Sequence, residues 1–136
     1  MSTLRQLFYV SRIAEGVDDR AIRNILAISR RNNRMLDVTG CLGCTGSYFA
    51  QVLEGREEAL AELARRIAAD PRHSEFRLLL DRSVTLREHP LWAMAFVSAL
   101  GLDDDLQALF DGTEPSPRKT LQLMARIKPD TVMGAL

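Results

Sequence analysis

The sequence predicts one α+β domain in which a single sheet carries helices on both faces. Short apolar runs, several of them alternating with period two, predict strands, and two stretches with helical periodicity stand between them. The predicted order is strand, helix, strand, strand, helix, strand. The chain has 136 residues, of which 46% are hydrophobic, so one domain with a real core is expected.

The first half of this pattern begins with an apolar strand over Leu4–Ser11. A helix is expected to open at Asp18-Asp19, because acidic side chains are favoured at the positive end of the helix dipole. Its inner face follows helical spacing and consists of Ile22, Ile25, Leu26 and Ser29. The helix is predicted to end near Asn32-Asn33, since asparagine tolerates the left-handed conformation of a helix cap.

Two strands and a second helix are predicted next. Val38–Cys44 and Tyr48–Leu53 flank the turn residues Thr45-Gly46-Ser47 and predict a β-hairpin. A helix begins at Glu57-Glu58 and ends before Asp70-Pro71. Its apolar face consists of Leu60, Leu63, Ala64 and Ile67.

The remaining strands are expected at Phe76–Leu80 and Leu91–Val97, and in the second of these Trp92, Met94 and Phe96 share a face by alternation. This order is the ferredoxin-like βαββαβ arrangement with one added strand. Two tail helices are expected, over Asp103–Phe110 and from the cap Ser116-Pro117 to Lys128. We expect residues 1–98 to form the main domain and residues 99–136 to cover the free face of its sheet.

Composition argues against several classes of protein. Basic and acidic residues balance at 18 each, so a general affinity for nucleic acid or anionic membranes is not expected. No apolar stretch approaches the roughly 20 residues of a membrane span, and the N-terminus lacks the apolar core of a signal peptide. A soluble cytoplasmic protein is therefore expected.

The two cysteines, Cys41 and Cys44, form a C-x-x-C pattern inside a predicted strand. Residues three apart in a strand point to opposite faces, so this pair is not expected to bind a metal or to form a disulfide. The two histidines, His73 and His89, do not stand at metal-ligand spacing from a cysteine. No metal site is predicted.

The most informative residue is Gln51, a polar side chain inside an apolar strand. A buried amide without a partner costs roughly 1–3 kcal/mol, so a partner is expected. Tyr9 has the matching strand parity, and Asn32-Asn33 stand at the end of the first helix. These groups together suit a planar, hydrogen-bonding ligand. Each of these residues taken alone also has a purely structural interpretation. Tyr9 and Gln51 could form a contact in the core, and Asn32-Asn33 could cap the helix. Likewise, Trp92 could be a core residue, and Arg65-Arg66 could lie on a solvated helix face.

The motifs jointly resemble the BLUF domains, which are blue-light sensors using flavin. The matching segments span about residues 4 to 97 and are Tyr9-Val10-Ser11, Asn32-Asn33, Val38-Thr39-Gly40, Phe49-Ala50-Gln51-Val52-Leu53-Glu54-Gly55, Asp70-Pro71-Arg72-His73 and Trp92-Ala93-Met94. Two segments depart from the family pattern, Gly43-Cys44 in the second strand and His89-Pro90 before the tryptophan.

The resemblance implies a flavin held non-covalently between the two main helices. Ile25 and Ile67 would sandwich its ring, which suits an apolar slot. The polar contacts implied for the rest of the flavin come from Asn33 with Asn32 nearby, Arg66 at a ring carbonyl, Gln51, and Asp70 at the ribityl chain. FAD is the usual ligand of the family, and the sequence leaves FMN open.

The resemblance also implies a photoreceptor. Tyr9 and Gln51 would carry the photochemistry, with Tyr9 as donor and with the Gln51 amide rotating or tautomerising. Ser11, Trp92 and Met94 would relay the change. We expect no enzyme activity, and we expect output through a partner protein or through changed self-association.

Three alternative functions compete with this prediction. A flavin redox enzyme needs a second site, and no dinucleotide fingerprint is present. An acylphosphatase-like hydrolase needs an arginine cradle, for which Arg12 is the candidate. An RNA-binding module is disfavoured by the neutral net charge.

Overall fold

The computed structural model describes residues 3–90 and 93–127, and it confirms the α+β, ferredoxin-like class. Five strands form one sheet in the order β4-β1-β3-β2-β5. The strands are β1 (Leu4–Ile13), β2 (Thr39–Cys44), β3 (Tyr48–Arg56), β4 (His73–Val84) and β5 (Ala95–Ser98). The three pairings among β4, β1, β3 and β2 are antiparallel, while the added strand β5 runs parallel to β2 at one edge.

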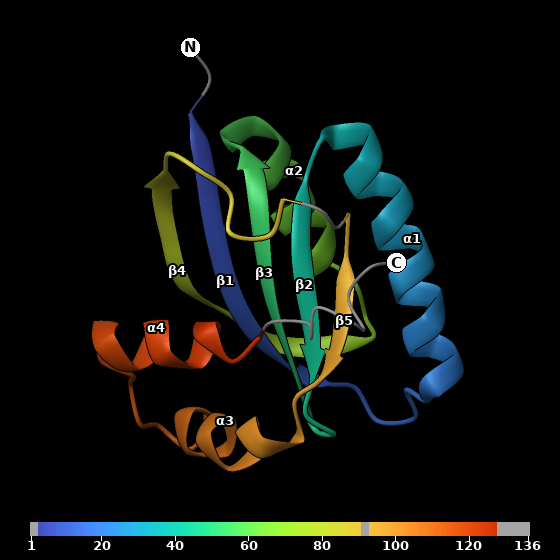
Figure 1. Cartoon of the computed structure of the whole chain (residues 1–136). Coiled ribbons are helices and arrows are strands. Elements are labelled where there is room, and N and C mark those ends of the chain that lie inside the picture. Colours follow the sequence, from blue (N-terminus) through green and yellow to red (C-terminus); the bar gives the residue numbers. More distant parts are fainter. Residues whose placement is uncertain (1–2, 91–92, 128–136) are drawn as a thin grey trace.

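The sheet is the middle of three layers (Figure 1). Helices α1 (Asp19–Leu36) and α2 (Glu57–Ala68) cover one face, which we call the pocket face. The short 3-10 helix η1 (Leu100–Leu102), α3 (Asp103–Phe110) and α4 (Pro117–Ala125) follow β5, and α3 and α4 cover the other face, which we call the tail face. This placement of the tail helices is the one expected from the sequence.

Strand alternation divides the core into two clusters. Leu7 and Tyr9 of β1 pack on the pocket face, while Phe8 and Val10 pack on the tail face. The two cysteines separate in the same way, Cys41 to the tail face and Cys44 to the pocket face. Both are free cysteines, on opposite faces of β2.

Two glycines of β2 permit close packing at opposite faces of the strand. A Cβ atom on Gly40 would lie 2.1 Å from the carbonyl oxygen of Val52, so this position excludes every larger residue. A Cβ on Gly43 would lie 3.0 Å from Cδ1 of Ile127, which is fully buried beyond the end of α4. Gly43, one of the departures from the family pattern, thus makes room for the tail.

Several predicted boundaries were wrong. Helix α1 continues past Asn32-Asn33 to Leu36, and Asp37, with φ of 54°, forms its left-handed cap. Among the described residues the added strand is Ala95–Ser98, whereas the prediction was Leu91–Val97, of which Leu91 and Trp92 lie outside the described residues. Strand β4 extends well beyond Phe76–Leu80. These ends depend on pairing with neighbouring strands, which local periodicity does not contain. Helix α4 ends at Ala125, and the N–H of the cap residue Arg126 donates to the carbonyl oxygen of Leu123. The prediction continued this helix to Lys128, which lies outside the described residues.

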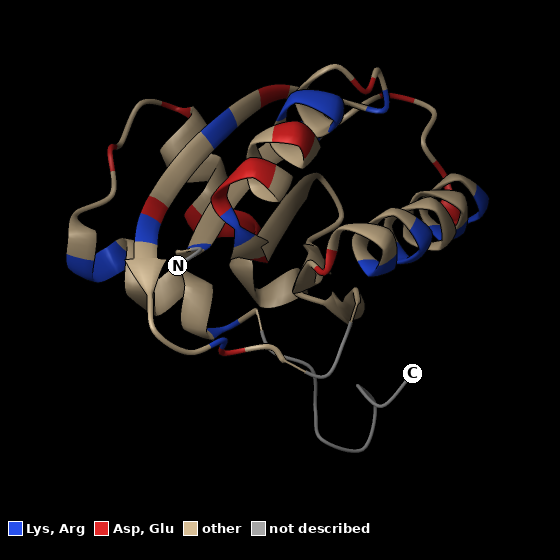
Figure 2. Cartoon of the chain, turned by 90° about the horizontal axis from the view of Figure 1, so that it is seen from above, with Lys and Arg blue, Asp and Glu red and all other residues tan. Residues whose placement is uncertain are grey.

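Charged residues of both signs are interspersed over the described part of the molecule (Figure 2). No helix in the described ranges is both long and apolar enough to cross a membrane. Within the same ranges, His, Cys, Asp and Glu form no group of three or more that could hold a metal ion.

Candidate functional site: a pocket between two helices

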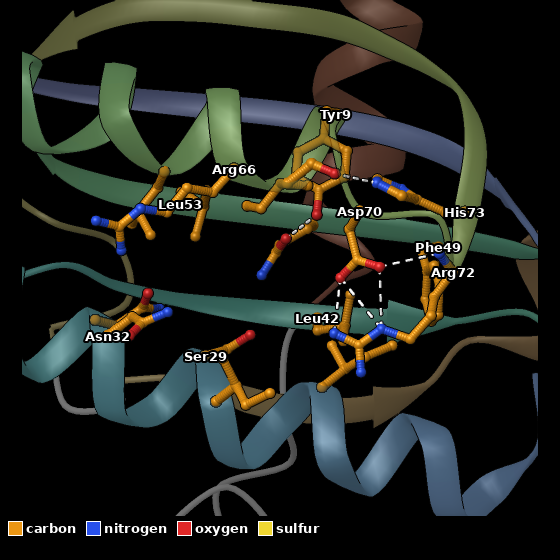
Figure 3. A pocket seen from close by; sticks show the side chains of 16 residues that line it. Tyr9, Ser29, Asn32, Leu42, Phe49, Leu53, Arg66, Asp70, Arg72 and His73 are labelled. Atoms are coloured by element: carbon orange, nitrogen blue, oxygen red, sulfur yellow. Dashed lines mark hydrogen bonds and ion pairs between the residues drawn. The ribbon is translucent and has the colours of Figure 1, made fainter.

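A pocket opens between α1, α2 and the pocket face of the sheet (Figure 3). Its empty volume is about 710 Å³ when the open space at its mouth is included. Every predicted flavin contact lines it: Tyr9 and Gln51 from the sheet, Ile25, Asn32 and Asn33 from α1, Arg66 and Ile67 from α2, and Asp70 just after α2.

The helices and the sheet each contribute both apolar and polar side chains to the lining of the pocket. Ile25 and Ile67 stand on the two helices that border the pocket, and each is only partly buried. Leu42, Phe49 and Leu53 of the sheet complete the apolar lining. A planar ring fits such a slot with its edge toward the polar side chains, so the residues present fit a flavin.

Tyr9 and Gln51 lie directly opposite each other on β1 and β3. The Tyr9 hydroxyl donates a hydrogen bond to Oε1 of Gln51, and Nε2 of Gln51 donates to Sδ of Met94 at 3.2 Å. All three residues are buried. The expected partner of the buried amide is therefore the tyrosine, and Met94 is the second partner.

The environment keeps Tyr9 protonated. Burial raises the pKa of the Tyr9 phenol far above its ordinary value, and the negative charge of Asp70 raises it further. The ring also packs against Phe76, with centroids 4.6 Å apart. The hydroxyl therefore remains a donor toward Gln51 at neutral pH.

Ser11, predicted as a relay residue, takes part in a hydrogen-bond chain beside Tyr9. It is fully buried, and its Oγ lies 2.7 Å from Nδ1 of His73. The other ring nitrogen of His73 bonds to the carbonyl oxygen of Ile67. A carbonyl only accepts, so Nε2 carries the proton, and in the neutral ring Nδ1 accepts from the Ser11 hydroxyl.

Asn33 was predicted to lie at the capping end of α1. It lies inside the helix and is buried, so it does not cap it. Its Nδ2 donates to the carbonyl oxygen of Ala93 at 2.6 Å. One turn earlier, Nε of Arg30 donates to the carbonyl oxygen of Met94 at 3.0 Å. Helix α1 therefore lines the pocket and also holds the residues that lead into β5.

The mouth of the pocket carries an ion pair between Asp70 and Arg72, with 2.7 Å between Oδ2 and Nη2 (Figure 3). The hydrogen bonds from Arg72 lower the pKa of Asp70, so this carboxylate is ionised at neutral pH. Arg72 also donates to Oδ1 of Asn24 on α1, and thereby connects the two sides of the mouth. Arg66 lines the pocket, but its Nε pairs with Glu62 at 2.9 Å on the outer side of α2.

The structure adds site residues that the predicted set did not include. They are Ile28 and Ser29 of α1, Leu42, Phe49 and Leu53 of the sheet, Leu63 of α2, and Arg72 and His73 after it. Arg72 and His73 had a signal in the sequence, because both stand in the Asp70-Pro71-Arg72-His73 motif. Trp92, predicted as a relay residue, lies outside the described residues.

The ferredoxin-like sheet with a Tyr–Gln pair at the base of a two-helix pocket is an arrangement that fits a flavin-binding domain. The sequence profile of the BLUF family, the sensors of blue-light using FAD, matches residues 4–95. The chain belongs to this family and is a blue-light sensor that binds flavin.

Individual relatives agree with this assignment. The blue light- and temperature-regulated antirepressor BluF of Escherichia coli (strain K12) is 38% identical over 110 residues, or 79% of this chain and 27% of the relative. Photoactivated adenylate cyclase subunit beta of Euglena longa is 32% identical over 68% of this chain and 11% of the relative. The chain thus spans about a quarter of the first protein and about a tenth of the second.

Among solved structures, the dark state of BlrB, a BLUF protein, superimposes with a TM-score of 0.77 at 36% identity. That match covers 93% of this chain and 96% of the other. A bacterial light-regulated adenylyl cyclase matches with a TM-score of 0.71 at 26% identity, over 94% of this chain and 41% of the cyclase chain.

Proposed function

We propose that this chain senses blue light through a rearrangement of the Gln51 hydrogen bonds and signals by contact with another protein. The observation that carries the proposal is the buried line Tyr9–Gln51–Met94, which joins the pocket to the start of β5. A bound oxidised flavin, for which FAD is the proposed form, supplies the absorption of blue light and, when excited, a strong electron acceptor.

Tyr9 is the proposed donor. Its phenol is held neutral by burial, so it gives up its proton only when its ring also gives up an electron. Gln51 Oε1 is the atom that receives the hydroxyl bond. The amide then rotates or tautomerises, because its oxygen accepts while its nitrogen donates and an exchange of the two reverses the pattern.

We propose that Met94 is the first residue to respond to the change in the Gln51 hydrogen bonds. A thioether sulfur is a weak acceptor, so the bond from Gln51 Nε2 is exchanged at low cost. The carbonyl oxygens of residues 93 and 94 are held by Asn33 and Arg30, so a shift of Met94 reaches α1 and β5 directly. The hydrogen bond between Ser11 and His73 is proposed to keep Tyr9 in place.

The proposed output is binding to a partner protein or a change in self-association, without enzyme activity of the domain itself. The antirepressor and the cyclases named above carry additional chain beyond the matched part, so their activities are not transferred to this chain. Within the described residues the pocket is flanked by the Asp70–Arg72 pair, which we propose lies near the ribityl chain.

The test is reconstitution with FAD or FMN followed by illumination. We expect a stoichiometric complex whose visible band shifts to the red in blue light and returns in the dark, with no net reduction. Bleaching by reduced nicotinamides with turnover would support the redox-enzyme alternative instead. Failure to bind either flavin would overturn the proposal.

A further inference from the structure

The connection from β4 to β5 carries the chain from one edge of the sheet to the other (Figure 1). It crosses over β1 and β3 near the ends where Gln6 and Glu54 lie. We call its described part, residues 85–90, the strap. Met94 follows His89 by five residues along the chain. The position of the strap therefore limits where Met94 can lie.

The carboxylate of Glu54 binds the strap through two hydrogen bonds. Oε1 accepts from the backbone N–H of His89 at 2.7 Å, and Oε2 accepts from the backbone N–H of Glu88 at 2.9 Å. Oε2 also accepts from Nε2 of Gln6 at 2.8 Å. Glu54 and Gln6 are both fully buried. Three N–H donors thus converge on one buried carboxylate, and two of them belong to the strap.

The orientation of the Gln6 amide is fixed by Arg82 on β4. Nε of Arg82 donates to Oε1 of Gln6 at 2.8 Å, so the amide nitrogen of Gln6 must face Glu54.

Arg87 adds a second attachment of the strap. It donates to the carbonyl oxygen of Asp37 at 2.8 Å and to Oγ1 of Thr39 at 2.9 Å. The strap is therefore attached to β3 through Glu54 and to the start of β2 through Arg87.

Only a carboxylate satisfies this arrangement. Both of its oxygens accept, and every hydrogen-bonding group that faces them is a donor. A glutamine at this position would place N–H groups against N–H groups, and leaving buried donors unpaired is unfavourable. Hydrogen bonds to a charged acceptor are also stronger than those between neutral groups.

We propose that Glu54 is a positioning residue of the photocycle, because it anchors the strap that keeps Met94 beside Gln51. The contact it controls is the bond from Gln51 Nε2 to Met94 Sδ. Glu54 acts from the tail face of β3, whereas Gln51 faces the pocket from the same strand, so its influence reaches the pocket through the strap and does not pass through the flavin contacts. This inference rests on the proposed function, in which Gln51 is the switch.

The test compares Glu54→Gln with the matched control Glu88→Gln in the flavin-loaded full chain. Glu88 stands in the same strap, but its side chain is exposed and pairs with Arg82 on the surface, while the strap contact uses its backbone N–H. Both changes remove one carboxylate of equal size. We expect Glu54→Gln to slow dark recovery severalfold, because the dark arrangement of Met94 is less favoured, and to leave flavin affinity unchanged. The control should recover at the rate of the wild type.

A direct readout in the dark separates this inference from the proposed function. The methyl resonance of Met94, assigned with Met94→Leu, should shift in Glu54→Gln, and the amides of residues 88 and 89 should exchange faster. These two measurements test the anchor even if the wild type shows no red shift, which would overturn the proposed function alone. If Glu54→Gln does not fold, Gln6→Met removes one of the three donors and should give a smaller change in the same direction. An unchanged Met94 resonance together with unchanged recovery in the folded variant would overturn the anchor.

Discussion

Tyr9 and Gln51 face each other across β1 and β3, and the hydroxyl of one donates to the amide oxygen of the other. The register of two antiparallel strands creates this contact without help from any loop. The proposed donor and the proposed switch therefore lie on the two inner strands, where β1 and β3 each have a neighbour on both sides.

Gln51→Ala should abolish the light-induced red shift while flavin remains bound. The apolar slot that holds the ring does not require the amide, whereas the switch does. Tyr9 loses its acceptor, so the free energy of unfolding should fall by about 1–3 kcal/mol. Difference absorption spectra and urea unfolding measure the two effects. A normal red shift in this variant would exclude Gln51 as the switch.

Tyr9→Phe should keep the fold and the flavin and lose the normal photocycle. Phenylalanine fills the ring site against Phe76 but has no hydroxyl to donate. Unfolding should become easier by roughly 1–2 kcal/mol, because Oε1 of Gln51 loses a buried donor. Transient absorption after a blue flash is the measurement. Tyr48→Phe is the matched control, because it removes a buried tyrosine hydroxyl on the tail face.

Asp70→Asn should lower stability at neutral pH but make little difference in acid. Arg72 lowers the pKa of Asp70 in the folded state, so the stabilisation is present above the unfolded pKa of about 3.9 and is lost as pH falls through the lower folded value. The pair is partly exposed, and about 1 kcal/mol is expected at pH 7. Urea unfolding of both proteins at neutral pH and near pH 3 tests the sign. A difference that grew in acid would contradict it.

Illumination should change amide hydrogen exchange within residues 93–127 if the output passes through β5 and the tail. The route is Met94, which contacts Gln51 and enters β5, the strand that precedes η1 and α3. Tyr9→Phe under the same light serves as the control for heating. Identical protection in dark and light, with unchanged size by light scattering, would show that α3 and α4 only cover the sheet.

The order of elements and the division of strand residues between two faces could be predicted from the sequence, because alternation and helical spacing are local properties. The same parity placed Tyr9 and Gln51 on one face. It could not show that Asn33 reaches Ala93, because that contact depends on where β5 packs beside α1. The bond between Ser11 and His73 likewise joins residues 62 positions apart, through the pairing of β1 with β4.

Gly43 and its neighbour Leu42 serve opposite faces of the sheet. Its missing side chain admits Ile127 on the tail face, while its neighbour Leu42 lines the pocket on the other side. The joint between sheet and tail is thus a matter of shape at one position and requires no polar contact there. A Cβ added at residue 43 would press on Cδ1 of Ile127, which would have to give by a few tenths of an ångström, while Leu42 on the pocket side would be untouched. The missing side chain in β2 thus lets one residue of the tail pack directly against the strand whose other face lines the pocket.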